Sequence, residues 1–157
     1  MPHSTMRRDT IVRQARTSDV DDIVALIDLY VADGTLLARS REFIRERLGD
    51  FLVAVDGETI LGCVHLEEYS PSIAEIRSLA VSPSAQGRGV GVSLVDHAEQ
   101  LAVRREYRTL FAVSNSEAFF GARGFLPRHI PELDRERSEV SRYKAVSAKD
   151  IAERAGS

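Results

Sequence analysis

The chain has 157 residues, of which 43% are hydrophobic and 29% charged, with a formal net charge of -3. This length suits one domain with a single packed core, and the nearly balanced charge argues against a general nucleic-acid binder or a protein held on an acidic membrane surface. The single cysteine, Cys63, excludes an internal disulfide framework, and no apolar signal peptide or membrane-length segment is present, so we expect a cytoplasmic protein.

The first part of the chain predicts one strand and two helices. Residues 11–15 read as a strand, and Thr17-Ser18-Asp19 supplies capping side chains before an apolar pattern of helical spacing over residues 20–30. Ser40 is placed to cap a second helix, which we expect to end at Gly49.

The middle of the chain changes to the pattern of strands. Two extended runs, 51–55 and 59–66, are joined around Asp56-Gly57, which is a strong signal for a β-hairpin. A third extended run covers residues 74–81. We therefore expect three consecutive antiparallel strands.

The last part of the chain predicts a long helix from Gly89, a strand over 109–113 and a short helix over 117–123. Gly124 suits the left-handed position after that helix, and residues 140–146 form a final extended run. The order of elements predicts an α+β fold with a single mixed, mainly antiparallel sheet flanked by helices. One domain would span residues 1–157, with flexible ends at 1–9 and about 150–157.

Three glycines, at positions 87, 89 and 91, stand where the third strand of the hairpin region gives way to the long helix. Glycine lets the backbone approach a ligand closely, and a helix N-terminus offers unpaired N–H groups, so this segment predicts a pyrophosphate site. The dinucleotide fingerprint fails because Val92 occupies the place of its third glycine. The nucleotide-triphosphate loop fails because no Lys-Ser/Thr pair follows Gly91.

The remaining pattern, Gln86-x-x-Gly89-x-Gly91 directly after residues 79–83, resembles the acetyl-CoA signature of the GNAT N-acetyltransferases. The predicted order of elements also matches the GNAT fold, with its CoA-binding strand, loop and helix. The alternative is a glycine-rich turn that binds nothing. The resemblance implies acetyl-CoA as cosubstrate and no metal. The expected cofactor-binding residues are Leu79, Ala80, Val81, Gln86, Gly87, Arg88, Gly89, Val90 and Gly91.

Acetyl transfer to an amine requires a group that removes a proton, because an ammonium has no lone pair. The resemblance places Glu75 on the strand beside the pantetheine arm, where a partly desolvated carboxylate can act as general base. The alternative is an exposed strand glutamate paired with Arg77. Many family members place a tyrosine before the final Gly-Phe pair as general acid; here Phe119-Phe120 stands there, and Ser114 is the nearest hydroxyl candidate.

Several segments resemble one GNAT subfamily, the amino-acid acetyltransferases that make N-acetylglutamate. They are residues 32–41, 74–76, 110–114 and 119–125, and the Gly-Thr-Leu-Leu-x-Arg-Ser-Arg stretch in the first is the most specific. The resemblance implies direct transfer to L-glutamate, the first step of arginine biosynthesis. The best-known members also carry an arginine-binding kinase-like domain, and we expect a short form without it.

Glutamate brings two carboxylates, which guanidinium groups bind with fixed orientation. The candidate substrate-binding residues are Arg39, Arg41, Arg77, Arg142 and Lys144. The alternative for Arg39 and Arg41 is that they are solvated residues at a helix start. We expect a small-molecule partner, no nucleic acid and no membrane, and the sequence is compatible with a homo-oligomer. Alternative functions are acetylation of another small amine or a protein N-terminus, and non-catalytic sensing of acyl-CoA.

The remaining reactive side chains are expected to be structural. Cys63 lies in an apolar strand and reads as a buried, inert thiol. His65, His97 and His129 show no spacing typical of metal ligands.

Overall fold

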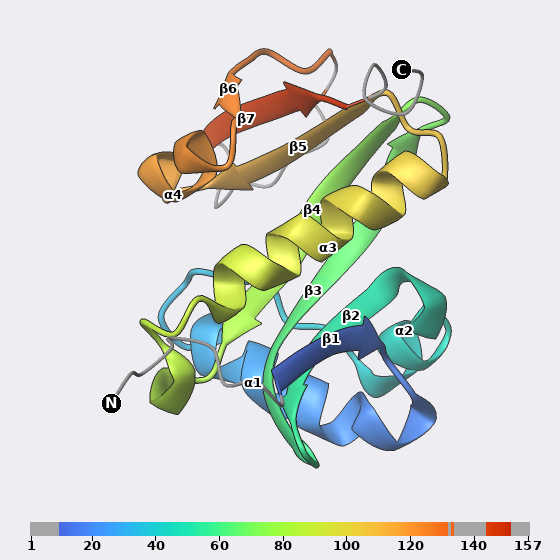
Figure 1. Cartoon of the computed structure of the whole chain (residues 1–157), viewed down its shortest axis with the longest axis vertical. Coiled ribbons are helices and arrows are strands. Elements are labelled where there is room, and N and C mark those ends of the chain that lie inside the picture. Colours follow the sequence, from blue (N-terminus) through green and yellow to red (C-terminus); the bar gives the residue numbers. More distant parts are fainter. Residues whose placement is uncertain (1–9, 132, 134–143, 152–157) are drawn as a thin grey trace. The chain divides into compact units, whose positions relative to one another are not determined.

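The computed structural model describes residues 10–131, 133 and 144–151 of the chain (Figure 1). Among these residues, seven strands form one mixed sheet in the order β1-β2-β3-β4-β5-β7-β6. The strands are β1 (Thr10–Gln14), β2 (Phe51–Asp56), β3 (Thr59–Ser70), β4 (Ile73–Val81), β5 (Thr109–Ser114), β6 (Leu126–Pro127) and β7 (Ala145–Asp150). The α-helices are α1 (Val20–Val31), α2 (Arg41–Arg45), α3 (Val90–Arg104) and α4 (Glu117–Ala122). The predicted α+β class with a mixed sheet is confirmed.

The described residues divide into two compact units. The first unit contains the residues up to Leu66 together with Ser78–Ala98, and the second contains Glu67–Arg77 together with the residues from Glu99 onward. Strands β3 and β4 and helix α3 contribute residues to both units. Each unit has an apolar cluster of its own.

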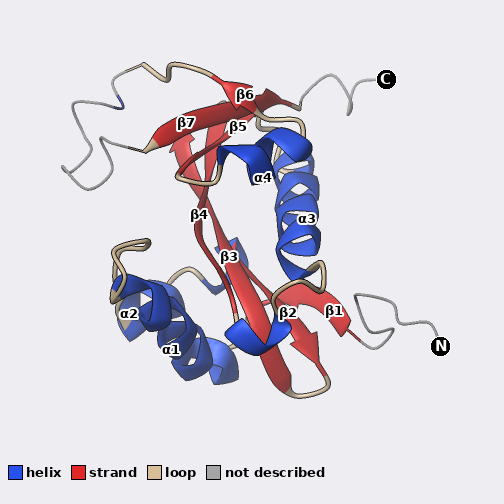
Figure 2. Cartoon of the chain, turned by 90° about the vertical axis from the view of Figure 1, so that its left-hand side faces the viewer, coloured by secondary structure: helices blue, strands red, loops and turns tan. Residues whose placement is uncertain are grey.

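The core of the first unit forms between α1, α2 and one face of β2 and β3. Alternate residues of β2 point to the same face of the sheet, and this face is apolar. The apolar residues of α1 recur every three or four positions and so form one apolar face of the helix, which packs on that face of the sheet. Figure 2 shows α1 and α2 on one side of β2 and β3, and the start of α3 on the other. The buried members of this cluster are Ala15, Val20, Ile23, Leu26, Ile27, Ile44, Phe51, Val53, Val55, Cys63 and Ala80.

Gly62 on β3 allows the start of α3 to lie close to the sheet. A Cβ atom at this position would lie 2.9 Å from Leu94 Cδ1, 3.0 Å from the Ala80 carbonyl oxygen and 3.1 Å from Val90 Cγ1. Real Cβ atoms essentially never make the shortest of these contacts. The first turns of α3 therefore lie so close to β3 that a side chain at this position would force Leu94, Val90 or the Ala80 backbone to shift.

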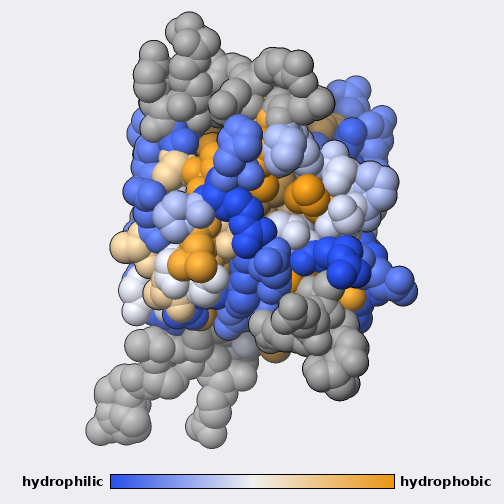
Figure 3. Space-filling view, turned by 90° about the horizontal axis from the view of Figure 1, so that it is seen from above, coloured by the Kyte–Doolittle hydropathy of each residue, from blue (hydrophilic) through white to orange (hydrophobic). Residues whose placement is uncertain are grey.

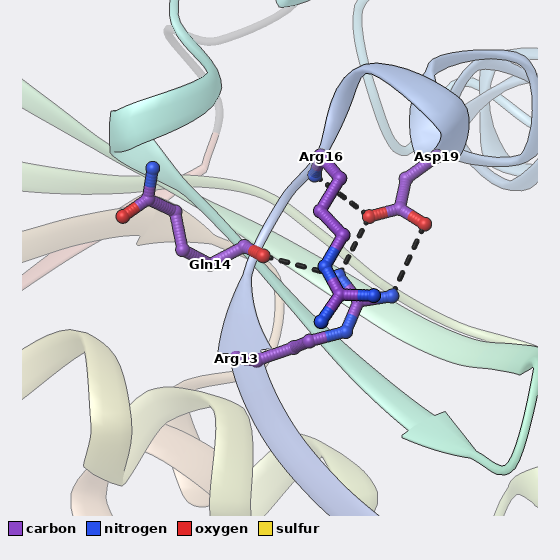
Figure 4. A network of polar contacts seen from close by, with 4 residues as sticks. All are labelled: Arg13, Gln14, Arg16 and Asp19. Carbon is purple, nitrogen blue, oxygen red and sulfur yellow. Dashed lines mark hydrogen bonds and ion pairs between the residues drawn. The ribbon is translucent and has the colours of Figure 1, made fainter.

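A buried carboxylate joins β1 to the start of α1 (Figure 4). Asp19 accepts hydrogen bonds from Arg13 Nη1 at 2.7 Å, from Arg13 Nη2 at 3.2 Å and from the Arg16 N–H at 2.8 Å. Burial by itself would raise the pKa of Asp19, but these hydrogen bonds favour the ionised form more strongly and the pKa is lowered. Asp19 occupies the N-cap position of α1, but its side chain makes no capping hydrogen bond to that helix and instead accepts from the Arg16 N–H before the 3-10 turn Thr17–Asp19.

The second unit is built on the pairing of β4, β5, β7 and β6. Strand β4 pairs in parallel with β5, and β7 runs antiparallel to both β5 and β6. Figure 1 shows α4 beside β5 and β7. Lys149 on β7 donates to Glu99 Oε1 at 2.8 Å and to the Arg123 carbonyl at 2.9 Å, which satisfies a carbonyl at the end of α4. The buried members of its apolar cluster are Phe111, Ile130, Leu133 and Ala148.

The middle of the chain follows the sequence prediction closely. Strands β2 and β3 form the predicted antiparallel hairpin, with Asp56 opposite Thr59. Only two residues join β3 to β4, its neighbour in the sheet, which requires an antiparallel connection. Gly124 has a φ of 96°, as predicted for the residue after α4.

The predicted end of the second helix is wrong. Helix α2 ends at Arg45 instead of continuing to Gly49, because Arg47, with φ of -128° and ψ of 30°, leaves the helical region and Leu48–Asp50 forms a separate 3-10 turn.

The final strand is β7 at 145–150, whereas 140–146 was predicted and residues 140–143 lie outside the described part. Asp150 pairs with Thr109, and Ile151 is fully buried, so these two residues do not belong to a flexible end. The charged Lys149 and Asp150 concealed this strand from the apolar pattern. Strand β6 was not predicted, since two residues show no periodicity.

The surface in Figure 3 is mainly hydrophilic, with separate small apolar patches. The large apolar side chains that are exposed among the described residues are Ile11, Leu29, Leu37 and Leu126. No helix in the described ranges has the length and apolar character needed to cross a membrane.

Candidate functional site

The glycine loop, defined here as residues 82–91, connects β4 to α3 in the first unit. Gly87 and Gly89 have φ angles of 81° and 78°, in the left-handed region that glycine adopts without strain. A Cβ added at Gly87 would meet no atom within 4 Å, so its backbone lies in open space. Helix α3 begins at Val90, and its first N–H groups and positive dipole end offer an anion site beside the loop.

The loop is tied to the sheet at its start. The Ser82 N–H donates to the Leu61 carbonyl of β3 at 2.8 Å, and the Ala85 N–H donates back to the Ser82 carbonyl at 2.9 Å. Ala85 is fully buried within the 3-10 turn Pro83–Ala85. At the other end, the Ser93 N–H donates to the Gly89 carbonyl at 3.0 Å, as the first turn of α3 requires.

Tyr30, near the end of α1, reaches the same loop. Its hydroxyl donates to the Val81 carbonyl at 2.5 Å and accepts from Gln86 Nε2 at 2.8 Å. In the sequence, Tyr30 is the last residue of the apolar pattern over residues 20–30, and that pattern does not predict this contact. The available signal was the phenol itself, because a hydroxyl on a buried helix face needs a hydrogen-bond partner.

Arg88, predicted to contact the pyrophosphate, lies beside the hairpin that joins β2 to β3. Its Nη2 atom is 3.9 Å from Asp56 Oδ2, which is an ion pair too long for a hydrogen bond. The side chain is partly exposed. The glycine loop therefore carries the positive charge of Arg88, with one carboxylate, Asp56, at ion-pair distance.

Strand β4 changes conformation just before the predicted backbone contacts at Leu79–Val81. Ser78 is buried and has a φ of 52°, a left-handed conformation that is rare for residues other than glycine. Cys63 Sγ donates to the Ser78 carbonyl at 3.4 Å. The recorded pairing of β4 with β5 ends at Ile76, opposite Ala112, two residues before this kink. Local strain of this kind is concentrated at functional sites.

Glu75, the predicted base, lies on β4 in the second unit and is buried, with 3% of its surface exposed. It is therefore not the exposed strand glutamate of the alternative interpretation. Arg77 Nε is 3.9 Å from Glu75 Oε2, while Arg77 Nη1 donates to Glu67 Oε1 at 3.2 Å. The Arg77 neighbour that the alternative interpretation named is present at ion-pair distance, but the shorter contact of Arg77 is with Glu67. A nearly fully buried carboxylate of this kind is unusual in proteins.

Ser114, the candidate general acid, ends β5 in the second unit. Its Oγ accepts a hydrogen bond from the Ser116 N–H at 3.0 Å. This contact stabilises the turn into α4 and uses the oxygen as an acceptor, so the hydroxyl hydrogen can still donate.

The two arginines before and at the start of α2 have different surroundings. Arg41 Nε lies 2.6 Å from Asp21 Oδ1 of α1, and this carboxylate raises the pKa of Arg41. The Arg39 guanidinium carbon lies 4.9 Å from the centre of the Phe43 ring, a cation–π distance. Ser40 Oγ accepts from the Phe43 N–H at 3.0 Å, which confirms the predicted cap of α2.

The remaining candidates give less information. Lys144 is partly buried immediately before β7, and Arg142 lies outside the described residues. Cys63 is fully buried, and burial raises its pKa to about 12, as expected for an inert thiol. His65 is buried and stacks on Phe51 with 4.4 Å between ring centres, which supports the prediction that it is structural.

Comparison with known proteins places these features in a wider group. The chain is 35% identical over 117 residues to an uncharacterized N-acetyltransferase from Chlorobaculum tepidum, covering 74% of this chain and 76% of that protein. It is 34% identical over 118 residues to the amino-acid acetyltransferase of Mycobacterium tuberculosis, covering 73% of this chain and 67% of that protein.

The fold also matches solved structures. The crystal structure of N-acetylglutamate synthase from Neisseria gonorrhoeae, complexed with coenzyme A and N-acetyl-glutamate, superposes with a TM-score of 0.83 at 30% identity. The match covers 92% of this chain and 36% of that protein. The chain likewise spans about a third of the length of several curated relatives named amino-acid acetyltransferase.

The predicted resemblance to the amino-acid acetyltransferases is thus confirmed at the level of relatives and fold. Residues 26–125, which include the second half of α1, the strands β2–β5, the glycine loop and α3, match the model of the Acetyltransferase (GNAT) family. The glycine loop and the mixed sheet are elements that the family resemblance predicted, whereas the kink in β4 at Ser78 was not predicted. The chain therefore belongs to the GNAT acetyltransferase family.

Proposed function

We propose that this chain is an acetyl-CoA-dependent N-acetyltransferase that acetylates the α-amino group of L-glutamate. The observation that carries the proposal is the glycine loop at the start of α3, with Gly87 and Gly89 in the left-handed region. Relatives named amino-acid acetyltransferase and a structural neighbour complexed with coenzyme A support both the reaction type and the donor. The product N-acetylglutamate would enter arginine biosynthesis.

The donor would bind along the end of β4 and the glycine loop. The loop backbone and the N-terminus of α3 would hold the pyrophosphate, with Arg88 supplying positive charge. Beyond the kink at Ser78, the backbone groups of Leu79–Val81 would hold the pantetheine arm in the manner of an added strand. One N–H of this stretch would polarise the acetyl carbonyl and stabilise the negative charge that develops on it.

The chemistry would be a direct transfer within a ternary complex. Glu75 takes a proton from the α-ammonium group, and the neutral nitrogen attacks the thioester carbonyl carbon. The C–N bond forms as the C–S bond breaks, and the nitrogen, which is then positively charged, loses its second proton. Ser114 or a water molecule relays that proton to the departing thiolate, donating one proton as it accepts the other, and Glu75 later releases its own proton to solvent. The buried position of Glu75 on β4, the strand whose end would hold the pantetheine arm, supports this assignment.

The acceptor would be recognised by cationic side chains, for which Arg39, Arg41, Arg77, Arg142 and Lys144 are the candidates. The ion pair of Arg41 with Asp21 favours a second candidate function, acetylation of an amino acid that has a single carboxylate. Such a substrate needs fewer guanidinium groups than glutamate does.

A thiol-release assay with acetyl-CoA and a panel of amines tests both candidate functions, acetylation of glutamate and acetylation of an amino acid with a single carboxylate. The panel contains glutamate, aspartate, glutamine, leucine, lysine and spermidine. Glutamate should give the highest kcat/KM, and a preference for glutamine or leucine would select the second candidate. Binding of acetyl-CoA without turnover of any amine would refute the enzyme and indicate a sensor of acyl-CoA.

A further inference from the structure

We propose that Tyr30 is a positioning residue for the donor: its phenol holds Gln86 and the Val81 carbonyl, and thereby fixes the glycine loop in the shape that binds the pyrophosphate. This inference rests on the proposed function, because it assumes that the loop binds acetyl-CoA. All the contacts that carry it lie within the first unit.

Tyr30 is itself firmly placed by its backbone. Its carbonyl accepts hydrogen bonds from the Thr35 and Leu36 N–H groups, each at 3.0 Å. Gly34, with a φ of 83°, turns the chain after α1 so that these two N–H groups can reach back. The phenol therefore projects from a helix end that is already closed, and little ordering is needed for it to reach the loop.

The phenol is satisfied both as a donor and as an acceptor. It donates to the Val81 carbonyl at 2.5 Å and accepts from Gln86 Nε2 at 2.8 Å. The direct contact from Gln86 Nε2 to the Val81 carbonyl is 3.5 Å, which is at the limit of a hydrogen bond. Tyr30 is thus the stronger of the two links from Gln86 to the body of the unit.

This link lies between two other anchors of the loop. Ser82 is tied to β3 at the start of the loop, and Gly89 is tied into the first turn of α3 at its end. Between them Gln86 is exposed and directly precedes Gly87, whose backbone lies in open space. Without the phenol, the loop would have to be ordered by the ligand at the moment of binding, which lowers affinity.

The test compares Tyr30→Phe with Tyr69→Phe as matched control. Tyr69 also donates from its phenol to a backbone carbonyl, that of Pro131 at 2.7 Å, but it lies in the second unit. Coenzyme A affinity is measured by equilibrium dialysis, and the steady-state constants by thiol release. Tyr30→Phe should weaken coenzyme A binding about fivefold and raise the KM for acetyl-CoA similarly, while kcat changes little. Tyr69→Phe should leave coenzyme A affinity unchanged.

A double-mutant cycle tests whether Tyr30 acts through Gln86. Gln86→Leu keeps the approximate size of the side chain and removes its donor. If the two residues act as one unit, Tyr30→Phe combined with Gln86→Leu should bind coenzyme A no more weakly than Gln86→Leu does. Fully additive losses would overturn the proposed route. Thermal unfolding shows whether each variant folds, and Gln86→Leu carries the test if Tyr30→Phe does not.

The outcomes separate this inference from the function on which it rests. Unchanged coenzyme A affinity in Tyr30→Phe, with normal binding by the wild-type chain, overturns the role of Tyr30 and leaves the enzyme standing. A wild-type chain that does not bind coenzyme A refutes the proposed function, and the role of Tyr30 falls with it.

Discussion

Two buried carboxylates, one in each unit, differ in the distance to their neighbouring arginine. Asp19 in the first unit receives three hydrogen bonds of 2.7 to 3.2 Å from Arg13 and the Arg16 backbone. Glu75 in the second unit has its guanidinium neighbour, Arg77, at 3.9 Å. Both side chains are almost fully inaccessible to water. Burial alone therefore does not separate a structural carboxylate from a proposed base, and the variants below compare the two roles directly.

Replacement of the proposed base should have the largest effect. Glu75→Gln keeps the size of the side chain and removes its ability to take a proton, so kcat should fall by about 100-fold or more. Acetyl-CoA affinity should stay near the wild-type value, because Glu75 does not hold the pyrophosphate. Steady-state kinetics with glutamate, together with coenzyme A dialysis, measure both quantities.

Glu67→Gln is the matched control for this variant. It removes the shorter ion pair of Arg77 and leaves Glu75 in place. Its kcat should remain within a few-fold of the wild-type value. A large loss of kcat in Glu67→Gln with a small loss in Glu75→Gln would show that the base is Glu67. Glu75 would then be a structural carboxylate, as Asp19 is.

Asp19→Asn should affect stability and leave the kinetics unchanged. It removes a charge that accepts hydrogen bonds from a guanidinium, and the free energy of unfolding at pH 7 should fall by about 2 kcal/mol. The pKa of Asp19 is lower in the folded chain than the unfolded value of about 3.9, so its contribution is present above that value and is lost as the pH falls through the folded pKa. The difference in stability between the variant and the wild type should therefore begin to shrink as the pH falls below about 4 and disappear only below the folded pKa, as measured by urea unfolding. A constant difference at all pH values would contradict the structural role.

The same distinction between structure and chemistry can be tested on two glycines. Gly87 and Gly57 have φ angles of 81° and 63°, and both have open space where a Cβ would be placed. Alanine at either position should cost about 1 kcal/mol of stability, because the left-handed region is unfavourable for it. Only Gly87→Ala should also weaken coenzyme A binding, by about tenfold, since only Gly87 lies in the loop. Equal affinities in the two variants would remove Gly87 from the donor site.

Cys63 is a third buried titratable group, and its ionisation should have the smallest effect on the protein near neutral pH. Its pKa of about 12 predicts no reaction of the native chain with an aromatic disulfide reagent at pH 8 and full reaction after unfolding. Because the thiol ionises first in the unfolded chain, at a pKa of about 8.5, stability should decline from about pH 9 upward. Rapid labelling of the folded protein would show that the strand around Cys63 opens.

The sequence predicted the elements whose signals are local. The Asp56-Gly57 hairpin, the cap at Ser40 and the glycine loop each depend on a few adjacent residues, and each is present in the structure. The α+β class and the mixed sheet follow from the order of such elements. The last strand was misplaced because the pairing of β7 with β5, which tertiary contacts decide, overrides the polar character of Lys149 and Asp150.

The contacts that complete the candidate site were less accessible. The hydrogen bond from the Tyr30 hydroxyl to the Val81 carbonyl joins residues 51 positions apart, and no periodicity in the sequence predicts such a pair. The pairing of Arg41 with Asp21, 20 positions apart, is similar. The left-handed φ of Ser78 was also missed, because no residue type at that position signals it. The roles of residues in the candidate site were therefore predicted from the family resemblance, whereas their hydrogen-bond and ion-pair partners became visible only in the structure.

Gly62 has a consequence for how this protein can vary. The glycine loop comprises residues 82–91, and the helix that follows it lies against a position on β3 that has no side chain. One of the obstructing atoms is the backbone oxygen of Ala80, which cannot rotate away as a side chain can. In a saturation mutagenesis screen that selects for growth on acetyl transfer, Gly62 should tolerate substitution as poorly as the glycines of the loop, although it touches no substrate.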